Sequence, residues 1–421
     1  MLKLKSIIPK LLDIKNDPIK TKAFKAANEA MGELFTAGII GHTCVRQQYL
    51  TAEMVQSLSK TCFSILLPMF LCTSIMKTVQ SNGGKLTPKT MAIPLIAIVH
   101  CLIMNYLSKY ILLPLFQMNS ESDEGRSTIV CCAFGNSGVI PLIFAEVLFR
   151  SNFEMVQKAF SFVSLYLVGW SPLFWSFGRF SLLGSSSSSS SKNMVNCDNL
   201  ESSSLKATII ETLDILKKLF PPPVIGVICG LIVSSIPFIQ CLLMKGKDDI
   251  NKPLLGVVYN SLKNLGKAAN PLALLVLTSS LALGTTTTIT TTADRDSDDD
   301  NNNKNQAIRS TNLLRRLSCV SVARFIISPL IMIMILYQIF GKMKGSGDGD
   351  GNSDIDTAMI WFILILESCM PPAQNSVLML QVAEKTKEAT KLARFLFSIY
   401  ASSMVPIMLI VTYLLEKCRL T

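Results

Sequence analysis

Two segments of the sequence place an asparagine beside residues that break a helix, each near the middle of a long apolar stretch. The first is Gly135-Asn136-Ser137-Gly138, followed by Pro141, and the second runs from Met370 to Ser376. In lipid, the backbone groups that proline and glycine free must be satisfied by protein or by cavity water. Half-helix N-termini carry unpaired N–H groups and partial positive charge, which suit a carboxylate. We therefore expect an anion site formed by Gly135, Asn136, Ser137, Pro141, Pro371, Pro372, Asn375 and Ser376.

The alternative is that these prolines are only packing kinks, because single prolines are common in membrane-spanning helices. Two interrupted spans at equivalent places of an internal repeat favour the cavity instead.

Four charged residues lie in or beside the same apolar stretches. Lys109 and Arg324 would each cost at least ~2.5–3.5 kcal/mol inside the membrane unless they reach the headgroups or find a partner. If they do not reach the headgroups, we expect them to stabilise an anion or a helix C-terminus. Glu146 and Glu367 flank the two breaks and are candidates for proton exchange, or they lie at span ends and face water.

Other chemistry is not indicated. The twelve cysteines form no CxxC pair, and two histidines are too few for a typical zinc site, so we expect no metal and no cofactor. His42 and His100 are each expected to pack between helices rather than to relay protons. No HExxH, GxSxG or P-loop motif occurs, which argues against an enzyme and against ATP-driven transport by this chain alone. No basic face interleaved with aromatic residues indicates nucleic-acid binding.

Composition identifies the elements that must position these residues. Hydrophobic residues make up 49% of the chain and charged residues 16%, with a mean hydropathy of +0.42. Soluble domains carry about 25% charged residues. Apolar runs long enough to cross ~30 Å of hydrocarbon recur along the chain. We predict an all-α membrane protein with about ten transmembrane helices.

The spans fall into two groups of five. We expect an N-terminal interfacial segment at 1–24, a first five-helix repeat at 25–183 and a hydrophilic linker at 184–218, which opens on a run of seven serines. A second five-helix repeat at 219–416 and a tail at 417–421 follow. An odd number of spans in each repeat forces the two halves into opposite orientations, as in many secondary transporters.

Three sequence correspondences support the repeat. The segment 107–115 of the third span aligns without gaps to 322–330 of the eighth, so that a cation precedes a proline by five residues in both. The segment 57–60 of the second span parallels 264–267 of the seventh. More loosely, Asn136-Ser137 and Asn375-Ser376 occupy the interrupted fourth and ninth spans.

These residues resemble the auxin efflux carrier family, and more narrowly its PIN-LIKES branch. The run from Cys131 to Gly138 is similar to the family's fourth-span motif, and Met370 to Ser376 is similar to its proline-bearing ninth-span partner. The start of the sixth span, 221–226, and the basic Arg324 add weaker matches. The resemblance implies inverted repeats with crossed fourth and ninth spans, a homodimer, and contact of Asn136 and Asn375 with the carboxylate of indole-3-acetate. The short central loop resembles the branch that resides in the endoplasmic reticulum, with plasma membrane and vacuole as alternatives.

We therefore expect a secondary transporter that moves a small organic anion, an auxin-like carboxylate, across a lipid bilayer by alternating access. The rival hypothesis is a membrane sensor that uses the same fold to bind a lipid or another small molecule without transport. An intramembrane enzyme would need paired catalytic groups at one depth, and asparagines do not act as acids or bases.

Overall fold

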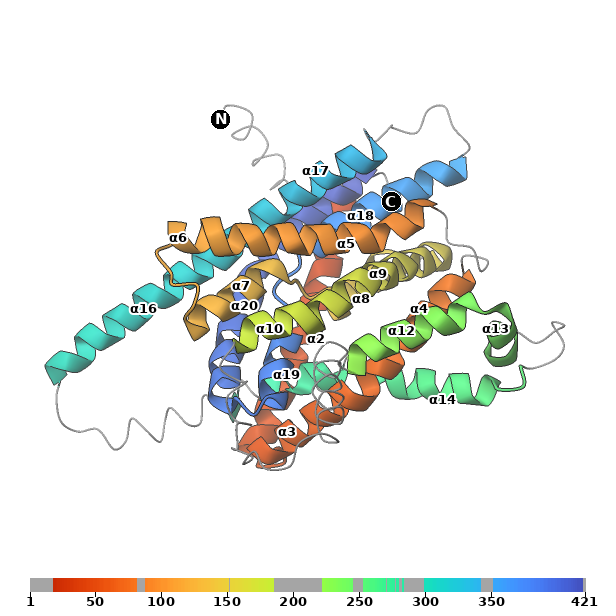
Figure 1. Ribbon diagram of the computed structural model, residues 1–421. Coiled ribbons are helices and arrows are strands. Elements are labelled where there is room, and N and C mark those ends of the chain that lie inside the picture. The colour runs from red at the N-terminus through yellow and green to blue at the C-terminus, as the bar shows by residue number, and fades with distance from the viewer. Residues whose placement is uncertain are drawn as a thin grey trace, which may run out of the picture.

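The computed structural model describes residues 18–81, 88–150, 152–184, 222–244, 253–269, 271–276, 278–279, 282–283, 299–341 and 351–418. Within these ranges the protein is all-helical, apart from one isolated β-bridge (Figure 1). The helices are α2 (Pro18–Arg46), α3 (Ala52–Thr61), α4 (Leu67–Ser81), α5 (Pro88–Leu107), α6 (Leu113–Leu115), α7 (Asp123–Ala133), α8 (Val139–Leu148), α9 (Phe153–Leu173), α10 (Arg179–Leu183), α12 (Pro222–Ser235), α13 (Pro237–Leu243), α14 (Gly256–Lys267), α16 (Asp299–Val322), α17 (Ser328–Phe340), α18 (Gly351–Ser368), α19 (Asn375–Val382) and α20 (Thr386–Cys418). Four π-helical turns, η1 (Cys62–Leu66), η2 (Ser108–Leu112), η3 (Phe174–Gly178) and η5 (Ala323–Ile327), join some of them into longer rods.

Five of the described rods are long and apolar enough to cross a membrane. They are Ala52–Lys77, Met91–Leu115, Phe153–Leu183, Thr311–Phe340 and Thr386–Cys418. A sixth candidate is the pair α12 and α13, whose axes meet at 102°. The sequence predicts one continuous sixth span from 221 to about 244. The helix turns instead at Ile236, which is extended because proline at position 237 disfavours the helical conformation of the residue before it.

Within the described residues, the other expected spans contain no helix that is both long and apolar enough to cross a membrane. In the two interrupted stretches, α7 and α8 have 11 and 10 residues, and α19 has 8. The sequence predicts a loop at 285–306, a stretch rich in threonine, aspartate and asparagine, whereas α16 already begins at Asp299.

Three of the π-helical turns have a common cause in the sequence. η1, η2 and η5 each end two residues before a proline, at Pro68, Pro114 and Pro329. Proline has no N–H and its ring clashes with the carbonyl four residues earlier, which lies within the π-helical turn in each case. The wider turn accommodates that clash without breaking the rod.

Helix packing divides the described helices into two neighbouring groups. In one group, α4 packs against α12 and α14. Gly226 and Gly230, one turn apart on α12, lie directly on the backbone of α4 at Pro68 and Cys72, the close approach that small residues allow between membrane helices. In the other group, α5 packs on α9 and α17, and α18 packs on α9, α17 and α20. α5 and the rod of α16 and α17 run in opposite directions (Figure 1).

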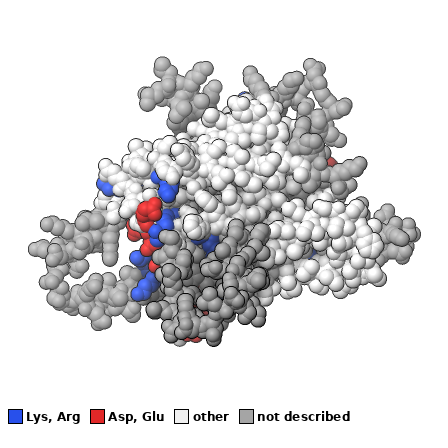
Figure 2. Space-filling model, viewed as in Figure 1, with Lys and Arg blue, Asp and Glu red and all other residues white. Residues whose placement is uncertain are grey.

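The surface separates apolar from charged regions. Exposed large apolar side chains stand along several rods, among them Leu95, Tyr106, Ile232, Met334 and Val405. The face in Figure 2 is largely free of charge, and acidic and basic side chains gather at the end that carries α7. Such a surface suits a chain whose middle is surrounded by lipid and whose ends meet water.

Several expectations concern residues outside the described ranges. Most of the N-terminal segment 1–24, nearly all of the linker 184–218, part of the seventh span and most of the tail 417–421 lie there.

Candidate functional site

The two interrupted stretches lie against each other and share backbone hydrogen bonds. Gly135 and Pro372 form an antiparallel β-bridge. The N–H of Asn136 donates to the carbonyl of Pro371 at 2.7 Å, and the N–H of Ala373 donates to the carbonyl of Phe134 at 3.0 Å. Residues that precede or form a proline favour extended backbone, so the second segment is preset for such pairing. The pairing satisfies backbone groups that both helix breaks would otherwise leave open in an apolar interior.

Arg324 lies at the C-terminal ends of α7 and α18, the two helices that stop at the breaks. Its guanidinium donates to the carbonyls of Met370 at 2.8 Å, Glu367 at 3.3 Å and Cys132 at 3.4 Å. Glu367 and Cys132 belong to the last turns of α18 and α7, so one cation sits at two helix C-termini. Helix C-termini carry partial negative charge, which a cation stabilises. The described residues form no ion pair with Arg324, which is 1% exposed.

Gly135 leaves the space that this arginine needs. A Cβ built at position 135 would fall on the guanidinium of Arg324 and come within 3.3 Å of the Met370 carbonyl. The glycine is therefore required for close packing and not only for breaking the helix.

Asn136 is anchored to the last long helix. Its side-chain amide donates to the hydroxyl of Tyr400 at 2.9 Å, and that hydroxyl donates to the Pro372 carbonyl at 2.9 Å. Tyr400 thus ties both breaks to α20.

A chain of buried polar groups supports the end of α18. Ser328 donates to the carbonyl of Ser368 at 2.7 Å and lies 3.0 Å from Nε2 of His100, whose Nδ1 is 3.4 Å from the Tyr166 hydroxyl. Because the Ser328 proton is used on Ser368, Nε2 is the donor and Nδ1 the acceptor on His100. His100 joins α5, α9 and α17, which agrees with the packing role expected for it.

A small central cavity lies at the other ends of the half-helices. Its volume is about 30 Å³, enough for about one water. Its walls include the residues that open α8 and α19, namely Asn136, Ser137, Gly138, Gln374 and Asn375, and parts of α4 and α9. The cavity therefore faces two positive helix N-termini, whereas Arg324 occupies the negative C-termini.

Several polar atoms of this cavity wall have no hydrogen-bond partner among the described residues. They are Nε1 of Trp170, Oγ of Ser171 and Oε1 of Gln374, each on a residue that is at most 3% exposed. Buried polar groups are nearly always satisfied, so atoms of this kind indicate a place for water or a ligand.

The structure brings most of the sequence-predicted residues together. Asn136, Ser137 and Asn375 line the cavity, and Gly135, Pro371 and Pro372 form the bridge behind it. Pro141 is buried in the first turn of α8, where a missing N–H removes no helical bond, and Ser376 is buried in the first turn of α19.

Of the four charged candidates, two are buried at the breaks and two lie away from them. Arg324 and Glu367 are buried at the breaks, and both carboxyl oxygens of Glu367 have no hydrogen-bond partner among the described residues. Lys109 lies apart from the cavity and pairs with Glu121 at 3.6 Å. Glu146 is exposed on α8. His42 is exposed on α2, so the expectation that it packs between helices is wrong.

Sequence reasoning missed four residues of the site: Trp170, Ser171, Gln374 and Tyr400. Gln374 stands inside the second motif and could have been read from it. Trp170 and Tyr400 lie in the interior of long apolar stretches, although such residues favour the membrane interfaces, and that position was an available signal. Ser171 carried no signal in the sequence.

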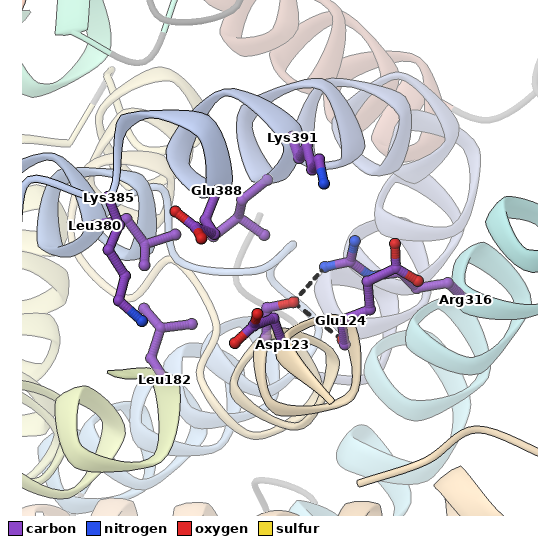
Figure 3. A pocket seen from close by; sticks show the side chains of 10 residues that line it. Asp123, Glu124, Leu182, Arg316, Leu380, Lys385, Glu388 and Lys391 are labelled. Atoms are coloured by element: carbon purple, nitrogen blue, oxygen red, sulfur yellow. Dashed lines mark hydrogen bonds between the residues drawn. The ribbon is translucent and has the colours of Figure 1, made fainter. Parts of the chain in front are cut away.

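A separate pocket of about 90 Å³ lies at the end of the molecule where α7 begins (Figure 3). Charges of both signs line it: Asp123 and Glu124 from α7, Arg316 from α16, and Lys385, Glu388 and Lys391 at the start of α20. Arg316 donates to the hydroxyls of Thr128 and Ser127 at 2.8 Å each and stacks on Phe395. These contacts fix α16 to α7 and α20, so Arg316 has a packing role.

Comparison with known proteins identifies a family for this chain. A family model described as membrane transport protein matches residues 26–345, which is 320 of the 421 residues. No curated protein matches the chain. The matched range includes the first break and Arg324 and ends before the second break.

Replacing Arg324 by methionine should destabilise the protein, because carbonyls of two helix ends lose their donor at ~1–3 kcal/mol for each buried group left unsatisfied. We expect a fall of several degrees in the thermal unfolding midpoint of the purified protein in detergent. Arg315→Met is the control, because Arg315 is an exposed arginine on α16, the helix that leads into the turn of Arg324. Equal midpoints for the two variants would contradict the capping role.

Gly135→Ala should likewise prevent the two breaks from closing on Arg324, since the added methyl overlaps the guanidinium. We expect lost folded yield, measured by monodisperse elution in detergent. Gly138→Ala is the control, because it is the same substitution three residues later and its added Cβ has no heavy atom within 4 Å. A tolerated Gly135→Ala would show that the arginine has room elsewhere.

Proposed function

The chain belongs to the membrane transport protein family, and on that premise we propose that it moves a small organic anion across a membrane by alternating access. Membership implies a secondary transporter, integral to the membrane and with several spans, and excludes an enzyme. It agrees with the resemblance to the auxin efflux carriers at the level of the family. The substrate, the branch and the compartment are the proposals that go further.

The separation of charge at the breaks supports an anionic substrate. Arg324 already occupies the two helix C-termini, so the cavity faces the N-termini of α8 and α19. The partial positive charge of these helix N-termini and the side-chain amides of Asn136 and Asn375 favour a carboxylate over a cation. Trp170 and Trp175 in the same wall add an aromatic surface that suits an aromatic or apolar substrate body.

An inverted-repeat architecture of about ten spans is part of the proposal. η2 and η5 begin at Ser108 and Ala323, the residues that the sequence alignment of the third and eighth spans pairs. The two rods run in opposite directions, and the two helix breaks pair with each other. Each observation is expected if the fourth and ninth spans cross at the centre of two inverted repeats.

The size of the cavity supports alternating access. A space for about one water cannot hold an organic acid, because ligand sites usually measure about 300–1,000 Å³. Substrate must therefore enter by a rearrangement that separates α4 from the breaks. Lys60 at the end of α3 forms an ion pair at 3.2 Å with Glu384, which follows the end of α19. The same rearrangement would open this contact.

Glu367 is the candidate for coupling to protons. It is buried, and an ionised carboxylate without donors is costly in an apolar interior. It also belongs to the turn that Arg324 caps, so a change of its charge would act on the end of α18. The PIN-LIKES branch, the endoplasmic reticulum and a homodimer stay predictions that rest on the resemblance alone.

Asn375→Ala and Asn136→Ala should each lower the uptake of labelled indole-3-acetate into proteoliposomes. Loss of one hydrogen bond to a charged group corresponds to ~1.5–3 kcal/mol, or about ten- to hundredfold in kcat/KM. Asn264→Ala on the exposed face of α14 is the control. Saturable uptake that is unaffected in both variants would remove the site from the pathway. Binding without any uptake by the wild type would favour the sensor.

Glu367→Gln should abolish the stimulation of uptake by an imposed pH gradient and leave downhill uptake in place. Glutamine keeps the shape of the side chain and cannot exchange a proton. Glu146→Gln, an exposed carboxyl on α8, should keep the stimulation. A variant at position 367 that responds to the gradient like the wild type would contradict a coupling role.

A further inference from the structure

A larger cavity lies beside the central one, toward the end of the molecule where α4 ends and α14 begins. Its volume is about 200 Å³, and α4, α8, α9 and α14 supply its walls. The contact of Gly266 with the backbone of α4 at Phe70 draws α14 close to α4 at this place.

Three lysines line this cavity, Lys77 on α4 and Lys263 and Lys267 on α14. No acidic side chain is among the described lining residues, and the lysines form no ion pair with the described part of the chain. Lys263 and Lys267 are spaced i, i+4, a like-charge pair that destabilises an isolated helix by a few tenths of a kcal/mol. The described lining therefore carries three positive charges and no negative charge, which favours binding of an anion from outside.

The rest of the wall is suited to the body of an organic anion. Phe70, Leu142 and Phe160 are apolar, and Tyr259 and Ser164 add hydroxyl groups. A free inorganic ion would gain little from the aromatic side chains, whereas a carboxylate with an apolar or aromatic body would use both parts of the wall.

The cavity adjoins the central one. Phe70 lines both cavities. On α9, Ser164 of the outer cavity is followed one turn later by Leu167 of the central one, and on α8 Leu142 follows Gly138 by one turn. One turn of helix is 5.4 Å, so the two spaces lie next to each other, and Phe70 belongs to the walls of both.

We propose that this outer cavity, the lysine vestibule formed by Lys77, Lys263 and Lys267 over Phe70, Leu142 and Phe160, captures the organic anion before Phe70 admits it to the central cavity. The proposal rests on the proposed transport function and extends it with an entrance, a charge filter and a gate. The pocket at the opposite end is lined by charges of both signs (Figure 3). A purely cationic lining is therefore a property of this end and not of both.

The charge filter can be tested without transport. Ser164→Cys would place a thiol in the vestibule wall, in a background in which the exposed Cys229 and Cys241 are serine. We expect an anionic methanethiosulfonate to react faster than a cationic one of the same size. Replacing the three lysines by glutamine should lower that rate ratio about tenfold, the lower end of electrostatic focusing in a cleft.

The control set is Lys385→Gln, Lys387→Gln and Lys391→Gln at the opposite end, which should leave the ratio unchanged. The parent without Ser164→Cys gives the background reaction. A ratio that the vestibule substitutions change by less than twofold would overturn the proposal and leave these lysines as headgroup contacts.

Uptake then tests the capture step. The triple glutamine variant should raise KM for a carboxylate about tenfold with kcat unchanged, and high salt should raise the wild-type KM toward that of the variant. An unchanged KM would overturn capture even if the thiol ratio falls. If the wild type moves no carboxylate at all, the transport proposal fails, and the thiol ratio still decides whether the vestibule selects anions.

Discussion

The guanidinium of Arg324 is the contact on which the arrangement of the breaks depends. A helix that stops inside an apolar interior leaves carbonyl groups without donors, and two such helices stop here, at Ala133 and Ser368. Arg324 donates to carbonyls of both ends and of the segment between α18 and α19. Burial of the cation is unfavourable by several kcal/mol, and the dipoles of two helix C-termini offset it. The buried cation is tolerated because two helix C-termini surround it, and the carbonyls at those C-termini are tolerated because the cation donates to them.

The contact of Arg324 with the C-termini of α7 and α18 also determines which helix ends face the central cavity. With both C-termini occupied by a cation, the N-termini of α8 and α19 are the ends that face a cavity. Tyr400 and the bridge between Gly135 and Pro372 keep those N-termini side by side. An anion site formed in this way consists mainly of backbone groups and neutral amides, so it needs no buried cation that would hold the substrate permanently.

The same frame suggests where the molecule moves. The bridge, Arg324 and the chain through Ser328 and His100 join the breaks to α5, α9, α17 and α20 with buried hydrogen bonds. α4 meets the breaks mainly through apolar side chains around the central cavity, and α3 meets the far end through the exposed ion pair of Lys60 and Glu384. Exposed ion pairs contribute about 0–1 kcal/mol to stability. The contacts of α3 and α4 with the breaks are therefore weaker than the buried hydrogen bonds that join the breaks to the other helices. We expect the group of α4, α12 and α14 to move as one body against the rest.

The sequence by itself determined the helical class, the two breaks and the residue types at them, because proline, glycine and asparagine act locally on the backbone. It also determined that Lys109 and Arg324 occupy matching places, since both precede a proline by five residues. Only the tertiary structure decided their different roles: Arg324 meets two helix ends, whereas Lys109 lies near a rod end with Glu121. It alone placed Tyr400, Trp170 and the lysine vestibule, whose members are far apart in the chain. Such groupings depend on which helices pack together, and hydropathy and spacing within one segment carry no information about its neighbours.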